Sequence, residues 1–209
     1  MSSKGKKLPE ETGFDRVLAF TLPDCGVRGR VVRLGPVLDT VLSAHEYPVP
    51  IKHLLSEALV TTALMGSLLK ELDSQLTLQA HAEGGSVELL VCDFRKGELR
   101  GYVRHDRETL GNIGANPSLH TLFGEGHLAI TFDLAASNER YQGIVALEGS
   151  SLSEACESYF SKSEQVPTLL RVGVCTEGGR SIASGLLLQH IPDGEAGKAR
   201  LDTKLDHPD

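Results

Sequence analysis

The chain has 209 residues, of which 40% are hydrophobic and 23% are charged, and its formal net charge is −7. That length suits one domain or two small ones, and it suffices for a substantial buried core. The composition is ordinary for a soluble globular protein, which excludes disorder over the whole chain. The acidic balance argues against nucleic acid as a partner, because nucleic-acid-binding proteins usually present a basic face.

The sequence shows neither a membrane span nor a signal peptide. No stretch approaches the roughly 20 consecutive apolar residues that a spanning helix needs. Residues 1–12 are polar and charged and lack the apolar segment of a signal peptide, so we expect a disordered tail there. We therefore expect a cytoplasmic location, no membrane partner, and cysteines that remain thiols in a reducing compartment.

Two strands and two helices are predicted in the first third of the chain. The strands are expected at 16–23 and 26–34, where Gly29 suggests a bulge or close backbone packing. A short helix is predicted over 35–48, where two X–Pro pairs end it. The strongest helical pattern covers 50–72 and is apolar on nearly all sides, which predicts a helix buried between two layers.

A run of strands is predicted next, and its turn signals favour an antiparallel meander. The expected strands are 75–82, 86–94, 99–105, 127–134 and 140–148. A second long helix is predicted to begin near Ser151, with Ser151 and Glu154 forming a reciprocal capping box. Two last strands, at 168–176 and 181–191, complete an α+β domain over residues 13–192. Residues 193–209 are highly charged and lack an apolar face, which is typical of a linker.

The four cysteines show no zinc-binding spacing, because no two of them lie within three residues of each other. Cys92, Cys156 and Cys175 lie in apolar patterns, so we expect three buried thiols. Cys25 lies in a turn-like segment and is the thiol expected to be most exposed. A cysteine hydrolase that uses Cys25 and a distant histidine is the alternative function.

The histidines are scattered and form no HExxH or other close helical pair, which favours surface or singly hydrogen-bonded roles over metal ligation. They are residues 45, 53, 81, 105, 120, 127, 190 and 207. A site assembled in three dimensions from cysteine and histidine stays open at this point.

Two matches to catalytic or nucleotide-binding signatures are interpreted as coincidental. The SxxK sequence at 67–70 lies inside the predicted long helix and lacks the accompanying SDN and KTG elements. The glycines at 124–129 lead into a strand rather than a helix, so a hairpin turn explains them better than a phosphate site. The lack of catalytic spacing favours a binding or scaffold protein.

Two segments carry residues that no simple structural pattern requires. One is RYQGIVALEG at 140–149, and the other is Tyr159-Phe160 followed by SEQVPT at 163–168. Together with Gly185–Gln189 and Pro192, they resemble the heat-shock protein 33 family of redox-regulated holdase chaperones. Further matching motifs lie at 27–29, 45–48, 54–59, 69–70, 99–101 and 126–131, so that the resemblance covers about residues 14–192.

The resemblance implies a core in which mixed or antiparallel sheets pack around buried helices, and it implies a homodimer. It also implies a non-enzymatic, ATP-independent chaperone that binds unfolding or aggregation-prone proteins under oxidative and heat stress. In the family, four cysteines of a C-terminal domain hold one zinc ion when reduced and form disulfide bonds when oxidised. We expect residues 193–209 to begin the linker to that domain, which this chain lacks. None of the chain's cysteines matches a zinc ligand, so no catalytic, cofactor or metal residue is assigned.

Seven residues of the matching motifs are candidates for a structural role or for contact with a second subunit. They are Tyr141, Gln142, Gly143, Ser163, Glu164, Gln165 and Pro167. Gly143 and Gly149 are expected to serve a turn or bulge, and Tyr159 is expected in the core beside Phe160. Residues 163–165 are expected to end the helix, where they satisfy free backbone groups or contact the second subunit. An inert dimerisation scaffold remains a third possible function.

Overall fold

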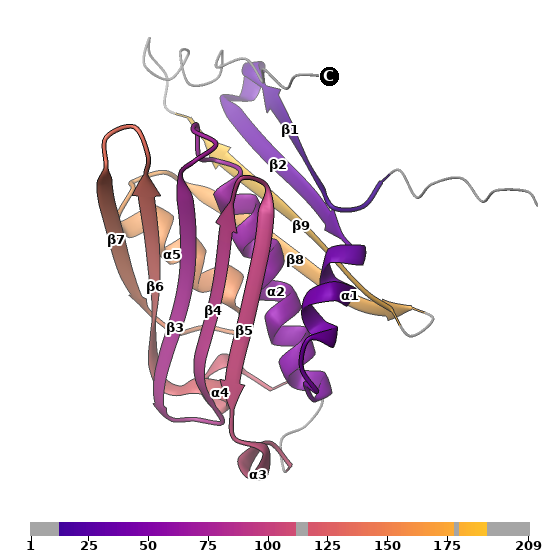
Figure 1. The fold of residues 1–209 in the computed structure, drawn as a ribbon. Coiled ribbons are helices and arrows are strands. Elements are labelled where there is room, and N and C mark those ends of the chain that lie inside the picture. Colours follow the sequence, from indigo (N-terminus) through magenta and orange to yellow (C-terminus); the bar gives the residue numbers. More distant parts are fainter. Residues whose placement is uncertain (1–12, 112–116, 178–179, 192–209) are drawn as a thin grey trace, which may run out of the picture.

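Residues 13–111, 117–177 and 180–191 are described by the computed structural model of the protein (Figure 1). They form two antiparallel sheets, and the long helix α2 (Val49–Gly66) lies between them. This arrangement confirms the α+β class and the prediction of sheets around a buried helix. The predicted domain limits, at residues 12 and 192, lie outside the described residues and stay predictions.

The four-stranded sheet joins the two ends of the described chain, with strand order β1-β2-β9-β8. Its strands are β1 (Arg16–Leu22), β2 (Val27–Leu34), β8 (Thr168–Glu177) and β9 (Arg180–His190). A short 3-10 helix, η1 (Pro23–Cys25), connects β1 to β2. The register runs without a shift through Gly29, so the predicted bulge is absent. The alternative prediction of close packing at this glycine holds, because the Phe20 ring lies against it.

The five-stranded sheet has the order β5-β4-β3-β6-β7 and is therefore not the simple meander expected from the sequence. Its strands are β3 (Gln75–Gly84), β4 (Val87–Arg95), β5 (Glu98–His105), β6 (Gly124–Leu134) and β7 (Glu139–Ala146). Strand β6 pairs with β3 instead of β5.

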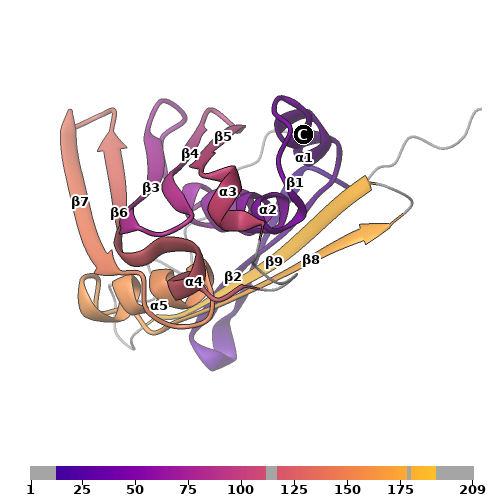
Figure 2. The same cartoon turned by 90° about the horizontal axis from the view of Figure 1, so that it is seen from below.

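Two short helices that the sequence analysis missed lie in the connection from β5 to β6. They are α3 (Arg107–Leu110) and α4 (Leu119–Phe123). Leu119, Leu122 and Phe123 are buried, which anchors α4 at the end of the sheet from which β6 starts beside β3 (Figure 2). Gly124 ends α4 with a positive φ of 62°, so the glycines at 124–129 do not form the predicted hairpin turn.

Helix α2 packs closely against both sheets because each sheet offers it a glycine. A Cβ at Gly185 of β9 would lie 2.4 Å from the Val60 side chain, and one at Gly101 of β5 would lie 2.8 Å from Leu55. Real Cβ atoms do not approach side chains so closely, so only glycine, which has no side chain, fits at these two positions. The result confirms that the helix is buried between two layers.

The long helix ends six residues before the predicted limit of Leu72. Gly66 lies against the Phe94 ring, and the Ser67 hydroxyl donates a hydrogen bond to the Leu64 carbonyl. Glycine and a serine bonded to the preceding turn both favour termination of a helix. The SxxK sequence therefore begins just after α2, and Leu72 is exposed.

Helix α1 (Pro36–Ser43) is also shorter than the helix predicted over 35–48. The chain leaves the helix after Ser43 and buries Tyr47 against the edge of the five-stranded sheet. There the Tyr47 hydroxyl oxygen accepts a hydrogen bond of 3.1 Å from the Val103 backbone N–H of β5. This hydrogen bond satisfies a backbone donor of the edge strand and holds Tyr47 outside the helix.

Helix α5 (Leu152–Lys162) packs beside α2, against β7 and β8 (Figure 2). Its predicted apolar face is confirmed, since Leu152, Cys156, Tyr159 and Phe160 are all buried. The Ser151 hydroxyl accepts from the Glu154 backbone N–H at 3.2 Å, as predicted. The reciprocal half of the capping box differs, because the Glu154 carboxylate accepts from the backbone N–H of Ser150 and not of Ser151.

A half-buried carboxylate links the two packed helices. Glu57 of α2 accepts hydrogen bonds from the Ser153 backbone N–H at 3.1 Å and from its hydroxyl at 3.2 Å. Burial raises the pKa of Glu57 above its ordinary value of 4.5, against the lowering effect of these hydrogen bonds. The folded protein therefore holds the Glu57 proton more tightly than the unfolded chain does.

We expect Glu57→Gln to gain stability relative to the natural protein as the pH rises from about 4.5 to 7.5. A raised folded-state pKa of an acid makes stability fall as the pH rises through that window, and glutamine removes the titration while it keeps an acceptor oxygen. The measurement is the urea-unfolding free energy of both proteins across this range. Glu46→Gln, at a highly exposed carboxylate, is the control. A difference between Glu57→Gln and the natural protein that stays flat with pH would contradict the expectation.

Candidate functional site

The outer face of the four-stranded sheet carries a contiguous set of apolar side chains. One row across the strands runs from Leu18 through Val31 to Leu186. Because side chains alternate between the two faces of a strand, these residues point away from α2, which contacts Gly185 on the opposite face. We call this surface the apolar sheet face; it consists of Leu18, Phe20, Leu22, Val31, Leu169, Leu186 and Leu188.

The apolar sheet face is open to solvent. The exposed fractions are 65% for Leu18, 48% for Leu22 and 38% for Leu169. Among the described elements, all helices longer than one turn lie on the other side of this sheet (Figures 1 and 2). Single exposed apolar residues are normal on proteins, but contiguous patches mark surfaces that bind another molecule.

Strand β9 shows that this sheet is built to be covered on both faces. Leu186, Leu187 and Leu188 follow one another, and alternate members of this run face α2 and the open side. A continuous apolar run is typical of strands buried on both faces, whereas a strand with one solvated face alternates between apolar and polar residues. This run was the sequence signal that could have revealed the apolar sheet face, which the sequence analysis missed.

A basic rim borders the apolar sheet face. Arg16 and Arg33 lie directly opposite each other at one end of β1 and β2. The Arg33 guanidinium also lies 4.1 Å from the centroid of the Phe14 ring. At the β8 edge, Arg171 forms an ion pair of 2.5 Å with Glu157. An apolar centre with a charged border is the usual anatomy of a protein-binding surface.

The candidates from the first matching motif lie on β7, the edge strand of the other sheet. Tyr141 is exposed and donates a hydrogen bond to Glu139, while Gln142 donates to the Thr131 hydroxyl at 2.9 Å. Gly143 keeps the regular register with β6 and serves neither the predicted turn nor a bulge. Its role is to make room for Tyr159, because a Cβ there would lie 2.1 Å from a carbon of that ring.

The candidates from the second motif form the turn between α5 and β8. Ser163 follows the last helical residue, and Gln165 has a positive φ of 54°. Glu164 accepts a hydrogen bond of 2.6 Å from the Tyr159 hydroxyl and not from a backbone group. The Pro167 carbonyl accepts from the His190 backbone N–H at 3.0 Å.

Tyr159 joins the two motifs, because its ring covers Gly143 and its hydroxyl holds Glu164. Burial and this carboxylate raise the pKa of Tyr159 well above its ordinary value, so the phenol remains a hydrogen-bond donor. The expected core position of Tyr159 and Phe160 is confirmed. Contact of the seven candidates with a second subunit stays a prediction.

The cysteines divide into two buried and two exposed thiols. Cys92 and Cys156 are fully buried, and burial raises the pKa of both thiols far above the ordinary value. Cys25 is exposed as expected. Cys175 is also exposed, which corrects the prediction of a buried thiol: it lies on β8, an edge strand.

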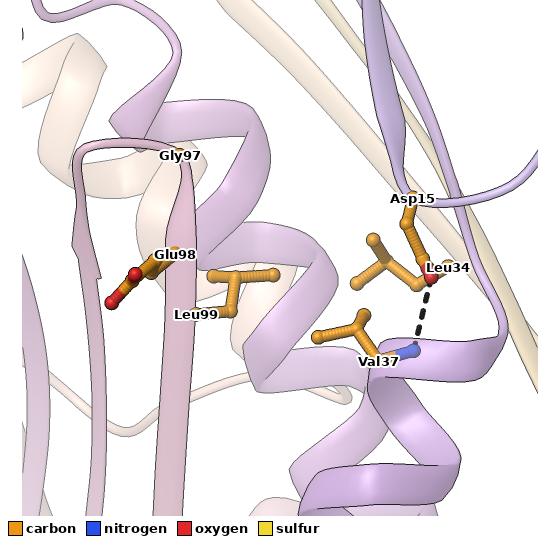
Figure 3. Close-up of a pocket in the computed structure, with 6 residues that line it drawn as sticks. All are labelled: Asp15, Leu34, Val37, Gly97, Glu98 and Leu99. Atoms are coloured by element: carbon orange, nitrogen blue, oxygen red, sulfur yellow. Dashed lines mark hydrogen bonds between the residues drawn. The ribbon is translucent and has the colours of Figure 1, made fainter.

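A cavity of about 340 Å³ opens between the β4–β5 turn and the start of α1 (Figure 3). Six residues line it: Asp15, Leu34, Val37, Gly97, Glu98 and Leu99. The Asp15 carboxylate accepts hydrogen bonds from the backbone N–H groups of Gly35 and Val37, at 2.9 and 3.0 Å. Asp15 therefore stabilises the first turn of α1, and the cavity offers a ligand few free polar groups.

The described residues offer neither a ready metal site nor a membrane-spanning helix. Within the described ranges, no three histidine, cysteine, aspartate or glutamate side chains are gathered so that they could hold a metal ion. None of the described helices has both the length and the apolar character that crossing a membrane requires.

Comparison with known proteins gives a consistent result. The family model described as Hsp33 protein matches residues 15–207. The 33 kDa chaperonin of Caulobacter vibrioides is 40% identical over 190 residues, which cover 87% of this chain and 62% of the relative. The 33 kDa chaperonin of Vibrio cholerae is 37% identical over 176 residues, which cover 84% and 58%.

A solved structure agrees with these relatives. The crystal structure of the 33 kDa chaperonin from Thermotoga maritima superposes with a TM-score of 0.72 at 26% identity, over 83% of this chain and 60% of that one. The chain thus spans about three fifths of the length of the relatives that it matches. On the strength of the family model and of these relatives, the chain belongs to the Hsp33 family.

Proposed function

We propose that this chain is the client-binding core of an ATP-independent holdase chaperone of a redox-regulated family, and that unfolding proteins bind to its apolar sheet face. The observation that carries the proposal is the contiguous, exposed apolar surface on a sheet whose other face packs against α1, α2 and α5. The family membership supports the same function. Membership of a chaperonin family gives no support to the alternative of a cysteine hydrolase. We do not propose an enzymatic activity.

The chemistry of the apolar sheet face suits unfolded segments of varied sequence. Apolar burial is non-directional and contributes roughly 25 cal/mol per Å², so covering about 300 Å² contributes about 7.5 kcal/mol before the cost of ordering the client. Binding of that strength is reversible, and it needs neither a specific client motif nor ATP. Unfolding proteins expose the apolar side chains that such a face would cover.

The zinc ion that the family resemblance implies does not fit the residues described here. Cys92 and Cys156 are buried separately with raised thiol pKa values, and the described ranges hold no group of three candidate ligands. Zinc thiolate sites need several deprotonated cysteines within one small coordination sphere. The proposal therefore gives this chain client binding and assigns no zinc-dependent step to its residues.

A homodimer in the cytoplasm is part of the same proposal. Its support is the family membership, together with an edge strand β7 on which Tyr141 is exposed. In this proposal the contact involves the seven motif residues around β7 and the α5–β8 turn. Clients would then bind to an assembly that carries two apolar sheet faces.

The test is light scattering from a heat-unfolded client protein to which this chain is added in reduced form and after peroxide treatment. We expect the chain to suppress the scattering in both states, because its apolar sheet face does not depend on a thiol. Absence of suppression in both states would refute client binding by this chain and leave the inert dimerisation scaffold as the remaining function.

A further inference from the structure

The outer face of the five-stranded sheet brings together two histidines that are far apart in the sequence. His81 of β3 lies directly opposite His127 of β6 in the register of the two strands. Two residues further along, Glu83 lies directly opposite Glu125 on the same face. All four residues are exposed. We propose that His81 and His127 bind one divalent cation that favours imidazole ligands, such as Ni²⁺ or Zn²⁺, beside the two glutamates.

The distance between the two rings fits a shared metal ion. The ring centroids of His81 and His127 lie 5.9 Å apart. With a metal–nitrogen bond of about 2.1 Å and a ring nitrogen roughly 1.1 Å from its centroid, two imidazoles that share an ion have centroids at most about 6.4 Å apart. The observed separation lies inside that limit, so both rings can reach one ion once they rotate to direct a nitrogen at it. Imidazole is a common ligand of nickel, copper and zinc.

A neighbouring side chain already orients one of the rings. The Gln79 side-chain amide lies 2.6 Å from Nε2 of His81. The amide nitrogen of Gln79 donates to the Nε2 lone pair, which places the ring proton on Nδ1. A metal ion that binds His81 through Nε2 therefore takes the place of the Gln79 amide.

The glutamate pair supplies the second argument for a cation. Like charges directly opposite on a sheet destabilise it, whereas opposite charges stabilise it. Neither Glu83 nor Glu125 takes part in an ion pair with another described residue. On the outer sides of the histidine pair, Leu89 of β4 lies opposite His81 and Ala146 of β7 lies opposite His127. Neither of these two residues carries a positive charge.

The four side chains are not gathered into a ready three-ligand group in this structure. The inference is therefore a two-histidine site on a rigid pair of strands, with water completing the coordination. The glutamates contribute negative potential next to the ion rather than fixed bonds. The site involves no thiolate, which distinguishes it from the zinc site implied for the family's C-terminal domain.

The test is isothermal titration of the untagged protein with NiCl₂, in a Cys25→Ser/Cys175→Ser background that removes the exposed thiols. We expect one site, and His81→Gln and His127→Gln are each expected to weaken its affinity at least about ten-fold. The double change Glu83→Gln/Glu125→Gln is expected to weaken it about two- to five-fold, as for exposed charges. Paramagnetic Ni²⁺ should broaden the imidazole NMR signals of His81 and His127 first.

His120→Gln is the matched control, because His120 is exposed on α4 and has no histidine opposite it. Its affinity for Ni²⁺ should equal that of the background protein, and circular dichroism should show that all variants remain folded. Unchanged affinity in both His81→Gln and His127→Gln would overturn the proposal. Equal losses in His120→Gln would do so as well. Unchanged affinity in the double glutamate variant would overturn the part given to the carboxylates.

Discussion

Replacing Leu18 and Val31 together with glutamate is expected to abolish the suppression of client aggregation while the protein stays folded. The two residues are directly opposite each other on β1 and β2 within the apolar sheet face, where a bound client would cover them. Each buried carboxylate without a partner costs at least about 1–3 kcal/mol, so client affinity should fall ten-fold or more. The free protein tolerates both charges because these side chains already contact water.

The control for this variant carries the same change on the other sheet. Tyr102 and Ile144 are exposed apolar residues on the outer face of the five-stranded sheet, with exposed fractions of 39% and 62%. Tyr102→Glu/Ile144→Glu adds the same charge to the same number of apolar positions. We expect it to suppress light scattering as well as the natural protein does.

Two outcomes would contradict the assignment of client binding to the apolar sheet face. One is full suppression by Leu18→Glu/Val31→Glu, which would place client binding elsewhere. The other is an equal loss in the Tyr102→Glu/Ile144→Glu control, which would show only that added negative charge repels the client. Thermal unfolding of each variant separates loss of binding from loss of fold.

Replacing Tyr159 with alanine is expected to have the largest effect on stability. The Tyr159 ring is buried, stacks on Phe132 with a centroid distance of 6.3 Å, and meets Phe160 edge-on at 5.4 Å. Its hydroxyl donates to Glu164. Removing a buried aromatic ring costs about 3–5 kcal/mol, so the urea-unfolding free energy should fall by that amount.

Gly143→Ala tests why this glycine lies under the Tyr159 ring. The added methyl group collides with the ring, and we expect a loss of about 1–3 kcal/mol in the natural background. In the Tyr159→Ala background the collision is gone, so the same change should cost much less. Gly173→Ala on β8, where a Cβ would meet nothing within 4 Å, is the control.

The double-mutant cycle separates packing from contact with a second subunit. Strong coupling between Gly143→Ala and Tyr159→Ala is the expected result of a direct steric contact. A Gly143→Ala variant that keeps its full unfolding free energy but loses the dimer would contradict the packing role. It would support the dimer contact predicted from the motif instead.

The candidate site was only partly predictable from the sequence. The motif residues Gly143, Tyr159 and Glu164 were all identified from the sequence, but their mutual contacts were not, because Gly143 lies in a different segment from the other two. The apolar sheet face was missed because Leu18, Val31 and Leu186 come from strands at opposite ends of the chain. Whether such residues form one surface depends on strand register, which a single strand does not reveal.

The sequence by itself determined the local elements and the family. Apolar runs, apolar–polar alternation and turn signals located the strands, and helical spacing located α2 and α5, because these patterns are properties of short segments. The motifs around residues 140–149 and 159–168 identified the family before any fold was known.

Only the tertiary structure decided where those elements meet. Pairing of β6 with β3 and the early ends of α1 and α2 depend on contacts between residues distant in sequence, such as Tyr47 with Val103. The same holds for the pairing of His81 with His127. The physical reason is that burial of the common core selects strand order and register, and local periodicity is equally satisfied by several of them.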